Sequence, residues 1–218
     1  MKRIKRKQLK EDEFVTTINK IIRFIKKRTK ELIALVVIVL IGILIFAGVR
    51  FVKSRINKRE ARTLSQIIKL NSELNDNPDS VEKLEELAGG GKFSALANVY
   101  LATYWIENGD FDRAISLLEK VEKGKKDIFY FQAKDLLAKI YMRKKNYDKA
   151  IEIYKRIEED NPSVYSLDVI LFNLAEAYEK KGDVEGALAL YKRIKEQFPM
   201  TSYGYDASQK VLRLEKEK

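Results

Sequence analysis

Cysteine and histidine are both absent from this 218-residue sequence, and only three prolines are present. Without cysteine and histidine the chain cannot form disulfides, use Cys–His or histidine acid–base catalysis, or build the usual zinc sites. The dominant residues are instead Lys, Glu, Leu, Ile and Ala, a composition that favours helix. We therefore expect an all-α protein with no catalytic, cofactor-binding or metal-binding residues.

The net charge of +11 is concentrated in two short segments. Residues 1–31 carry 12 basic and four acidic side chains, and residues 50–62 carry six basic and one acidic side chain. The remaining chain, residues 63–218, is therefore slightly acidic. A nucleic-acid-binding protein would be expected to spread basic residues over a folded face, so the charge pattern argues against a nucleic-acid partner.

Between the basic segments lies LIALVVIVLIGILIFAGV, residues 32–49, which has no polar side chain. Eighteen helical residues span about 27 Å, close to the roughly 30 Å hydrocarbon core of a bilayer. A buried core helix and a cleaved signal peptide are the alternatives. Basic clusters at both ends disfavour the first, and the poor cleavage site Ala47-Gly48-Val49 disfavours the second. We predict a single transmembrane helix over residues 32–49, with its basic flanks contacting the lipid bilayer.

The orientation of this span is less strongly determined, because residues 17–31 and 50–64 each contain six basic side chains. Only the whole tail, residues 1–31, tips the positive-inside rule toward a cytoplasmic N-terminus. Within the tail, basic residues alternate with apolar ones at helical spacing. This pattern predicts a basic amphipathic helix on an anionic leaflet, with an apolar side made of Phe14, Ile18, Ile21, Ile22 and Ile25.

The rest of the chain contains an internal repeat. Segments at about 95–126, 131–162 and 168–199 align, and they begin 36 and 37 residues apart. Small, aromatic and turn-forming residues recur at fixed positions. These sets are Ala102, Ala138 and Ala175; Ala114, Ala150 and Ala187; Trp105, Tyr141 and Tyr178; Gly109, Lys145 and Gly182; and Lys126, Pro162 and Pro199.

Each repeat is consistent with two antiparallel helices. The alanines allow close approach, the glycines end the first helix in a left-handed conformation, and Asp110, Asn146 and Asp183 are expected to cap the second. These residues carry the pattern of the tetratricopeptide repeat (TPR), so the chain resembles a TPR-type helical solenoid over residues 93–218. A capping helix at 203–216 is expected to cover the last repeat with Tyr203, Ala207, Val211 and Leu214.

Residues 50–92 should form a membrane-proximal stem. It is predicted to continue the transmembrane helix, with an apolar stripe of Ile56, Leu64, Ile67, Ile68 and Leu74, and then to form a short helix that Ser80 caps. Gly89-Gly90-Gly91-Lys92 follows. A phosphate-binding loop would need glycine at Glu86, Ser or Thr at Phe93, and a preceding strand. The glycines are therefore predicted to be a hinge, and no small-molecule substrate is expected.

Two longer segments, DEFVTTINKIIRFIKKRTKELIALVV and GGGKFSALANVYLATYWIENGDFDRAISLLEKV, support a further resemblance. The chain resembles the YfgM-like family of membrane-anchored TPR proteins of bacteria. The resemblance implies a single-pass protein of the inner membrane, with a cytoplasmic N-terminus and periplasmic repeats. It also implies an ancillary role at the SecYEG translocon and association with periplasmic chaperones such as PpiD.

The predicted function is a non-enzymatic scaffold or adaptor that binds partner proteins in a groove lined by the first helix of each repeat. Two alternatives remain open: an envelope-assembly adaptor with other partners, and the same module facing the cytoplasm. An enzyme is disfavoured because acidic residues alternate with Lys and Arg as on ordinary helix surfaces. The candidate groove residues are Gln132, Asp135, Lys139, Met142, Arg143, Val169, Phe172, Glu176, Glu179 and Lys180.

Overall fold

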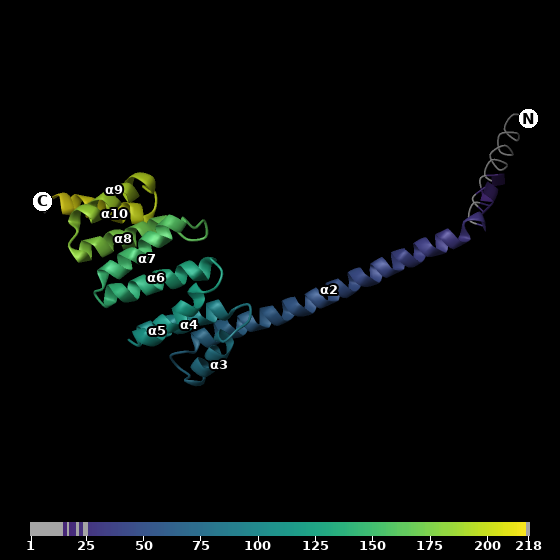
Figure 1. Ribbon diagram of the computed structural model, residues 1–218, viewed down its shortest axis with the longest axis horizontal. Helices are drawn as coiled ribbons and strands as arrows, with labels where there is room; N and C mark the ends of the chain where they lie inside the picture. Colours follow the sequence, from purple (N-terminus) through teal and green to yellow (C-terminus); the bar gives the residue numbers. More distant parts are fainter. Residues whose placement is uncertain (1–14, 17, 21, 24–25, 217–218) are drawn as a thin grey trace, which may run out of the picture. The chain divides into compact units, whose positions relative to one another are not determined.

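The computed structural model describes residues 15–216 except 17, 21, 24 and 25, and it describes only the backbone at 32, 35 and 36. Residues 1–14 of the predicted tail lie outside this range. Within the described residues the regular structure is helical, without strands (Figure 1). The chain divides into two compact units, Met1–Ala61 and Arg62–Lys218. The labelled helices are α2 (Thr29–Ser72), α3 (Asp79–Ala88), α4 (Ser94–Glu107), α5 (Phe111–Glu122), α6 (Ile128–Arg143), α7 (Tyr147–Asp160), α8 (Leu167–Lys181), α9 (Val184–Gln197) and α10 (Ser202–Lys216).

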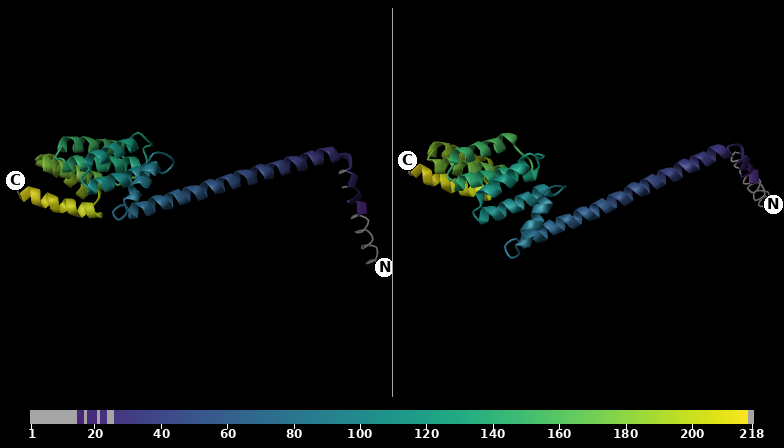
Figure 2. Two further views of the ribbon diagram at one scale, coloured as in Figure 1. Left: turned by 90° about the horizontal axis from the view of Figure 1, so that it is seen from below. Right: turned by 60° about the horizontal axis from the view of Figure 1, so that its bottom comes forward.

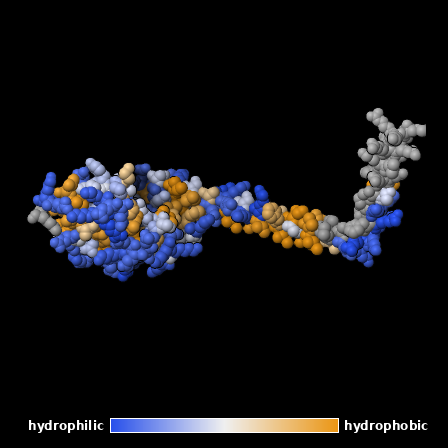
Figure 3. All heavy atoms as spheres, turned by 90° about the horizontal axis from the view of Figure 1, so that it is seen from above, coloured by the Kyte–Doolittle hydropathy of each residue, from blue (hydrophilic) through white to orange (hydrophobic). Residues whose placement is uncertain are grey.

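Helix α2 contains the predicted span and continues beyond it without a break, as the sequence indicated. It includes an 18-residue window of mean hydropathy 2.2, none of which is buried, so α2 is long and apolar enough to cross a membrane. Figure 3 shows this apolar stretch with hydrophilic surface on either side. Large apolar side chains in it are mostly exposed, including Leu44 at 71% and Phe46 at 67%. A lipid environment would cover surface that is otherwise costly to expose.

The predicted amphipathic helix is described only in part. Residues 15, 16, 18–20, 22 and 23 are helical, and Ile18 and Ile22 are exposed. Phe14, Ile21 and Ile25 lie outside the described residues, so the apolar side of this helix stays a prediction.

In the second unit, the end of α2 packs with α3 and α4. Ile67, Leu70, Leu74, Leu84 and Leu96 belong to one buried cluster. The predicted stripe is correct for Ile67 and Leu74, and Leu64 packs against the cluster. It is wrong for Ile56 and Ile68, which are 49% and 51% exposed. Leu70 takes the inward position because it follows Ile67 by three residues and precedes Leu74 by four, the spacing of one helix face.

The glycine stretch is exposed, but it connects two segments that pack together. Leu84 precedes the glycines and Leu96 follows them, yet both are buried in the same cluster. The side-chain amide of Asn98 also donates to the Ala88 carbonyl, at 2.9 Å. The division between the two compact units falls after Ala61, and the hinge at Gly89–Gly91 stays a prediction. Gly91 has φ +92°, a conformation suited to glycine.

The prediction that Ser80 caps the short helix is wrong. Helix α3 begins at Asp79, and Pro78 occupies the cap position. The Asn77 side-chain oxygen accepts the Asp79 N–H at 3.0 Å. Ser80 lies one residue inside the helix and is fully buried.

The three predicted repeats form the helix pairs α4–α5, α6–α7 and α8–α9. We call α4, α6 and α8 the A helices, and α5, α7 and α9 the B helices. All six repeat-position alanines are fully buried, as expected for small residues between packed helices. Asp110, Asn146 and Asp183 each accept a backbone N–H three residues ahead, at 3.1, 3.3 and 2.8 Å. These contacts confirm the predicted B-helix caps.

The turn between A and B helices has the same left-handed residue in each pair. Gly109 and Gly182 have φ of 79° and 92°, and Lys145 adopts φ 58° in the middle repeat. The replacement of glycine by lysine therefore leaves the turn conformation unchanged, although a side chain there carries a steric cost of about 1 kcal/mol.

The pairs stack one after another, with α10 last (Figures 1 and 2). Beyond neighbours in sequence, α4 contacts α6 and α8 contacts α10. Ion pairs join successive A-to-B turns, with Lys144–Asp112 at 3.3 Å and Lys181–Asp148 at 2.5 Å. The A helices therefore run parallel and form one face of the array, which we call the A face. Ala207, Val211 and Leu214 of α10 are buried against the last pair, as predicted.

Candidate protein-binding surface

The ten predicted groove residues lie on α6 and α8, but they differ in accessibility. Lys139, Arg143 and Lys180 are exposed on the A face, whereas Asp135 and Phe172 are buried. The remaining five are partly buried: Gln132, Met142, Val169, Glu176 and Glu179. The sequence-based set thus separates into side chains that a partner can reach and side chains that hold the surface together.

Asp135 belongs to the second group. The residue is 3% exposed. Its carboxylate accepts hydrogen bonds from Lys139 Nζ at 2.8 Å, the Tyr165 hydroxyl at 2.9 Å and Asn173 Nδ2 at 3.2 Å. Burial and the adjacent Asp135 carboxylate raise the pKa of the Tyr165 hydroxyl and of Tyr154, so both stay protonated and able to donate. A buried charge requires such partners, and these come from α6, α8 and the α7–α8 loop. Asp135 therefore fixes the spacing of two A helices.

Phe172 is buried for a different reason. Its ring lies 5.4 Å from the Tyr191 ring and 5.2 Å from the Tyr203 ring, so α9 and the start of α10 cover it. The prediction treated α8 as an open groove wall, but the capping helix packs against that part of α8. A shallow hollow remains between the two helices, lined by Phe172, Glu176, Asp206, Gln209, Lys210 and Arg213.

Glu179 joins α8 to α10. Its carboxylate accepts from the Tyr191 hydroxyl at 2.9 Å, from Lys210 Nζ at 3.0 Å and from Arg213. Partial burial alone would raise the pKa of Glu179, but the hydrogen bonds from Lys210 and Tyr191 hold that pKa below its usual value. Glu179 is thus charged and fully engaged at neutral pH, and it is a docking residue for α10.

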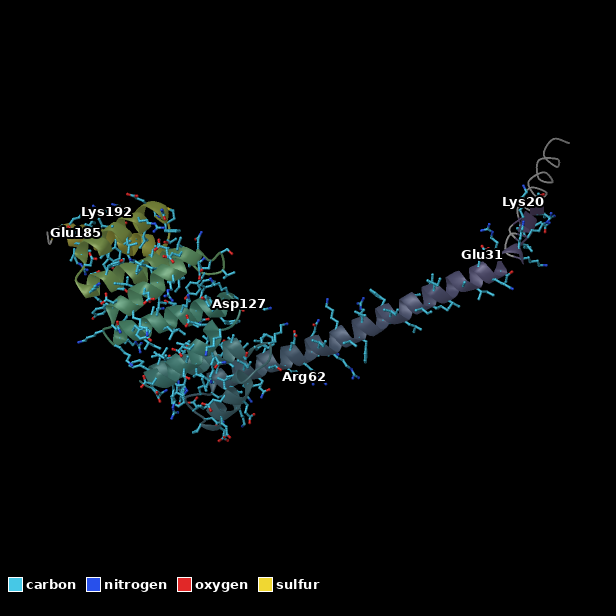
Figure 4. The ribbon with its side chains drawn as sticks, in the orientation of Figure 1. Lys20, Glu31, Arg62, Asp127, Glu185 and Lys192 are labelled. Carbon is cyan, nitrogen blue, oxygen red and sulfur yellow. The ribbon has the colours of Figure 1, made fainter. Side chains whose placement is uncertain are left out.

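Accessible side chains on the A face carry both signs of charge. Arg143 donates to the Ile106 carbonyl at 3.4 Å, which places its guanidinium across the α4–α6 junction. Lys180 occupies the equivalent repeat position on α8, and Glu176 lies one turn before it. Asp127, labelled in Figure 4, directly precedes α6. It caps this helix by accepting the N–H groups of Phe129 and Tyr130 at 3.0 and 3.3 Å. The face is therefore a rigid helical surface suited to hydrogen bonds and ion pairs with a partner segment.

Sequence reasoning missed the partners that build this face. Tyr165, Asn173, Lys210 and Arg213 support it, yet none lies at a position that the alignment of repeats singled out. A second feature was readable but overlooked. Ile128, Val164 and Met200 are 47%, 51% and 96% exposed and lie 36 residues apart. Each follows a B helix, so one exposed apolar side chain lies at or next to each connection from a B helix to the next helix.

Comparison with known families agrees with this architecture. Models of the tetratricopeptide repeat match residues 106–167 and 170–199, so these residues contain TPRs. No curated protein sequence matches the chain.

Solved structures with similar folds include proteins described as containing TPRs. A Podosopora anserina chain of nearly identical TPR-like repeats has a TM-score of 0.57 and 18% identity, over 70% of this chain and 84% of that one. MamA of AMB-1 has a TM-score of 0.51 and 19% identity, over 72% and 83%. The TPR2AB domain of yeast Sti1, solved as a complex with pHSP90, has a TM-score of 0.50 and 18% identity, over 58% and 50%. At these identities the likeness establishes the fold, which is a TPR-type solenoid.

Proposed function

We propose that this protein is a non-enzymatic adaptor, anchored in a membrane by α2, whose A face binds segments of partner proteins. TPR domains are protein–protein interaction scaffolds. The proposal rests on the finding that α6 and α8 each carry residues that fix the helices and other residues that remain accessible. Buried Asp135 and engaged Glu179 fix the helices, while Arg143, Lys180 and Glu176 remain accessible along one face. A preorganised surface of this kind loses little conformational entropy on binding.

The structural neighbours are consistent with this role. The Sti1 domain was solved with pHSP90, which illustrates that the same fold can hold a partner. On the present chain, the mixed charge of the accessible residues favours a partner segment that carries acidic side chains opposite Arg143 and Lys180. Such a segment would be recognised by charge-assisted hydrogen bonds.

The finer assignment rests on the resemblance to the YfgM-like family. We propose an inner-membrane location with a cytoplasmic N-terminus, periplasmic repeats, and partners among SecYEG translocon subunits and periplasmic chaperones. An envelope-assembly adaptor with other partners, or a cytoplasm-facing module, would use the same A face. A reporter fused to the C-terminus, assayed for periplasmic against cytoplasmic activity, distinguishes the two orientations.

The proposal predicts that charge reversal on the A face weakens partner binding. Arg143→Glu combined with Lys180→Glu should lower partner recovery from detergent extracts by about tenfold, because each substitution replaces an attraction by a repulsion at the interface. Neither residue belongs to the Asp135 or Glu179 networks, so the fold should persist. Quantitative pull-down with the full chain measures the effect.

The matched control is Lys120→Glu with Lys195→Glu, which makes the same charge change at exposed positions on the B helices α5 and α9. Recovery should stay within twofold of the original chain. Equal loss in both double variants would indicate a general charge effect, and an absence of any recovered partner with folded, abundant protein would contradict the adaptor function.

A further inference from the structure

A basic segment of α2 directly follows its apolar stretch. Residues 50–61 are all exposed apart from Glu60, which is partly buried. Five of these residues are Lys or Arg and only Glu60 is acidic. The segment is helical throughout, so its side chains take fixed directions around the helix axis. With 3.6 residues per turn, the cations divide between two sides.

One side, which we call the headgroup face, contains Arg50, Lys53, Ser54, Asn57 and Lys58. Together with Ala61 these residues line a shallow hollow on the helix surface. Ser54 and Ala61 have small side chains, and the other lining residues have longer ones. The opposite side carries Arg55, Arg59 and Arg62, which are spaced four and three residues apart. The two sides thus have equal numbers of cations but different shapes.

The two cations closest to the apolar stretch, Arg50 and Lys53, both belong to the headgroup face. Counting about 1.5 Å per residue from Val49, Arg50 and Lys53 lie about 2 and 6 Å along the helix, and Lys58 about 14 Å. Arg55, Arg59 and Arg62 lie at about 9, 15 and 20 Å. The polar layer of one leaflet is roughly 5–8 Å thick. Arg50 and Lys53 lie within this layer, and Lys58 can extend its long side chain back toward it. The opposite side has no cation within the layer, so the headgroup face places more charge there.

The side chains next to the cations also favour the headgroup face as the phosphate-binding side. The Arg55 guanidinium lies 4.6 Å from the centre of the Phe51 ring, an attraction that already occupies it. Phe51, Val52 and Ile56 are bulky and 59%, 56% and 49% exposed, so they crowd the opposite side. The headgroup face instead offers the side-chain donors of Ser54 and Asn57 between its three cations. Phosphate oxygens accept from such donors.

We infer that the headgroup face of α2 is a binding site for anionic phospholipid headgroups. The phosphate is held by Arg50, Lys53 and Lys58, and the hydrogen-bond donors Ser54 and Asn57 line the hollow between them. The inference rests on the proposed membrane anchoring, because only an inserted α2 places these side chains at the leaflet surface. Bound lipid would also set the rotation of α2 about its axis, and hence the direction in which the chain leaves the bilayer.

The test uses the full chain in nanodiscs of phosphatidylcholine with one fifth phosphatidylglycerol. After gentle extraction, the ratio of the two lipids retained by the protein is measured by mass spectrometry. The original chain should enrich phosphatidylglycerol at least fivefold over the nanodisc average, since each cation near the surface changes the preference by roughly fivefold. Arg50→Gln with Lys53→Gln and Lys58→Gln should abolish the enrichment, whereas Arg55→Gln with Arg59→Gln and Arg62→Gln should retain most of it.

The possible outcomes distinguish a failure of the membrane anchoring from a failure of the headgroup face. A chain that fails to enter nanodiscs would overturn the membrane anchoring itself. Insertion without enrichment, or equal loss in both triple variants, would overturn the headgroup face and leave the anchoring intact. Inorganic phosphate added at millimolar concentration should not displace the lipid, and displacement would indicate a general anion site in place of a lipid site.

Discussion

Replacing Gly204 by alanine is expected to lower the free energy of unfolding of the repeat unit by about 3 kcal/mol or more. A Cβ at this position would overlap the Phe198 carbonyl oxygen and lie 2.8 Å from the Phe198 carbonyl carbon. These are backbone atoms, so α10 would have to move away from the end of α9. Thermal unfolding of the full chain in detergent should show a decrease of about 10 °C.

Two other glycines provide graded controls. Gly182 has φ +92° but open space around its Cβ position, so Gly182→Ala should cost only about 1 kcal/mol. Gly90 has neither constraint, and Gly90→Ala should be nearly neutral. If Gly204→Ala unfolds at the same temperature as Gly90→Ala, the close contact between α10 and the α9–α10 turn does not exist in solution.

The second large effect is expected at Asp135. Asp135→Ala removes three hydrogen bonds and leaves the Tyr165 hydroxyl and the Asn173 amide without their carboxylate partner, which should cost about 3–4 kcal/mol. The same loss should weaken partner binding, because the spacing of α6 and α8 depends on this contact. Thermal unfolding and the pull-down assay report the two effects separately.

The matched control for this change is Asp148→Ala, which removes another carboxylate that pairs with a lysine. The Asp148 side chain is 79% exposed and that of its partner Lys181 is 45% exposed, so the expected cost is below about 1 kcal/mol. Similar losses for the two substitutions would show that Asp135 is not buried as described.

Periodicity in the sequence was sufficient to predict the repeats. The spacing of Ala102, Ala138 and Ala175 predicted where helices pack together. Glycine at two of the three turns predicted the left-handed backbone conformation that Lys145 also adopts. These features depend on local chemistry: small side chains, caps and positive φ. They are therefore visible in a single chain, as was the exposed apolar stretch of α2.

Contacts between repeats were harder to foresee. The residues next to Asp135 in the sequence give no sign that it is buried. Its partners Tyr165 and Asn173 are brought to it only by the fold. Phe172 occupies a groove position by alignment, but α10 covers it. The glycine stretch also resembled a boundary, although Leu84 and Leu96 pack across it. Each case depends on residues far apart in the chain, which repeat periodicity does not specify.

The proposed adaptor function requires that partners contact the A face more than the B helices. A photo-crosslinking amino acid placed at Arg143 or Lys180 in the membrane-embedded full chain tests this directly. The proposed function predicts discrete protein adducts from these two positions, and none from Lys120 or Lys195 on the B helices. Adducts of equal yield from all four positions, or none from Arg143 and Lys180, would contradict it.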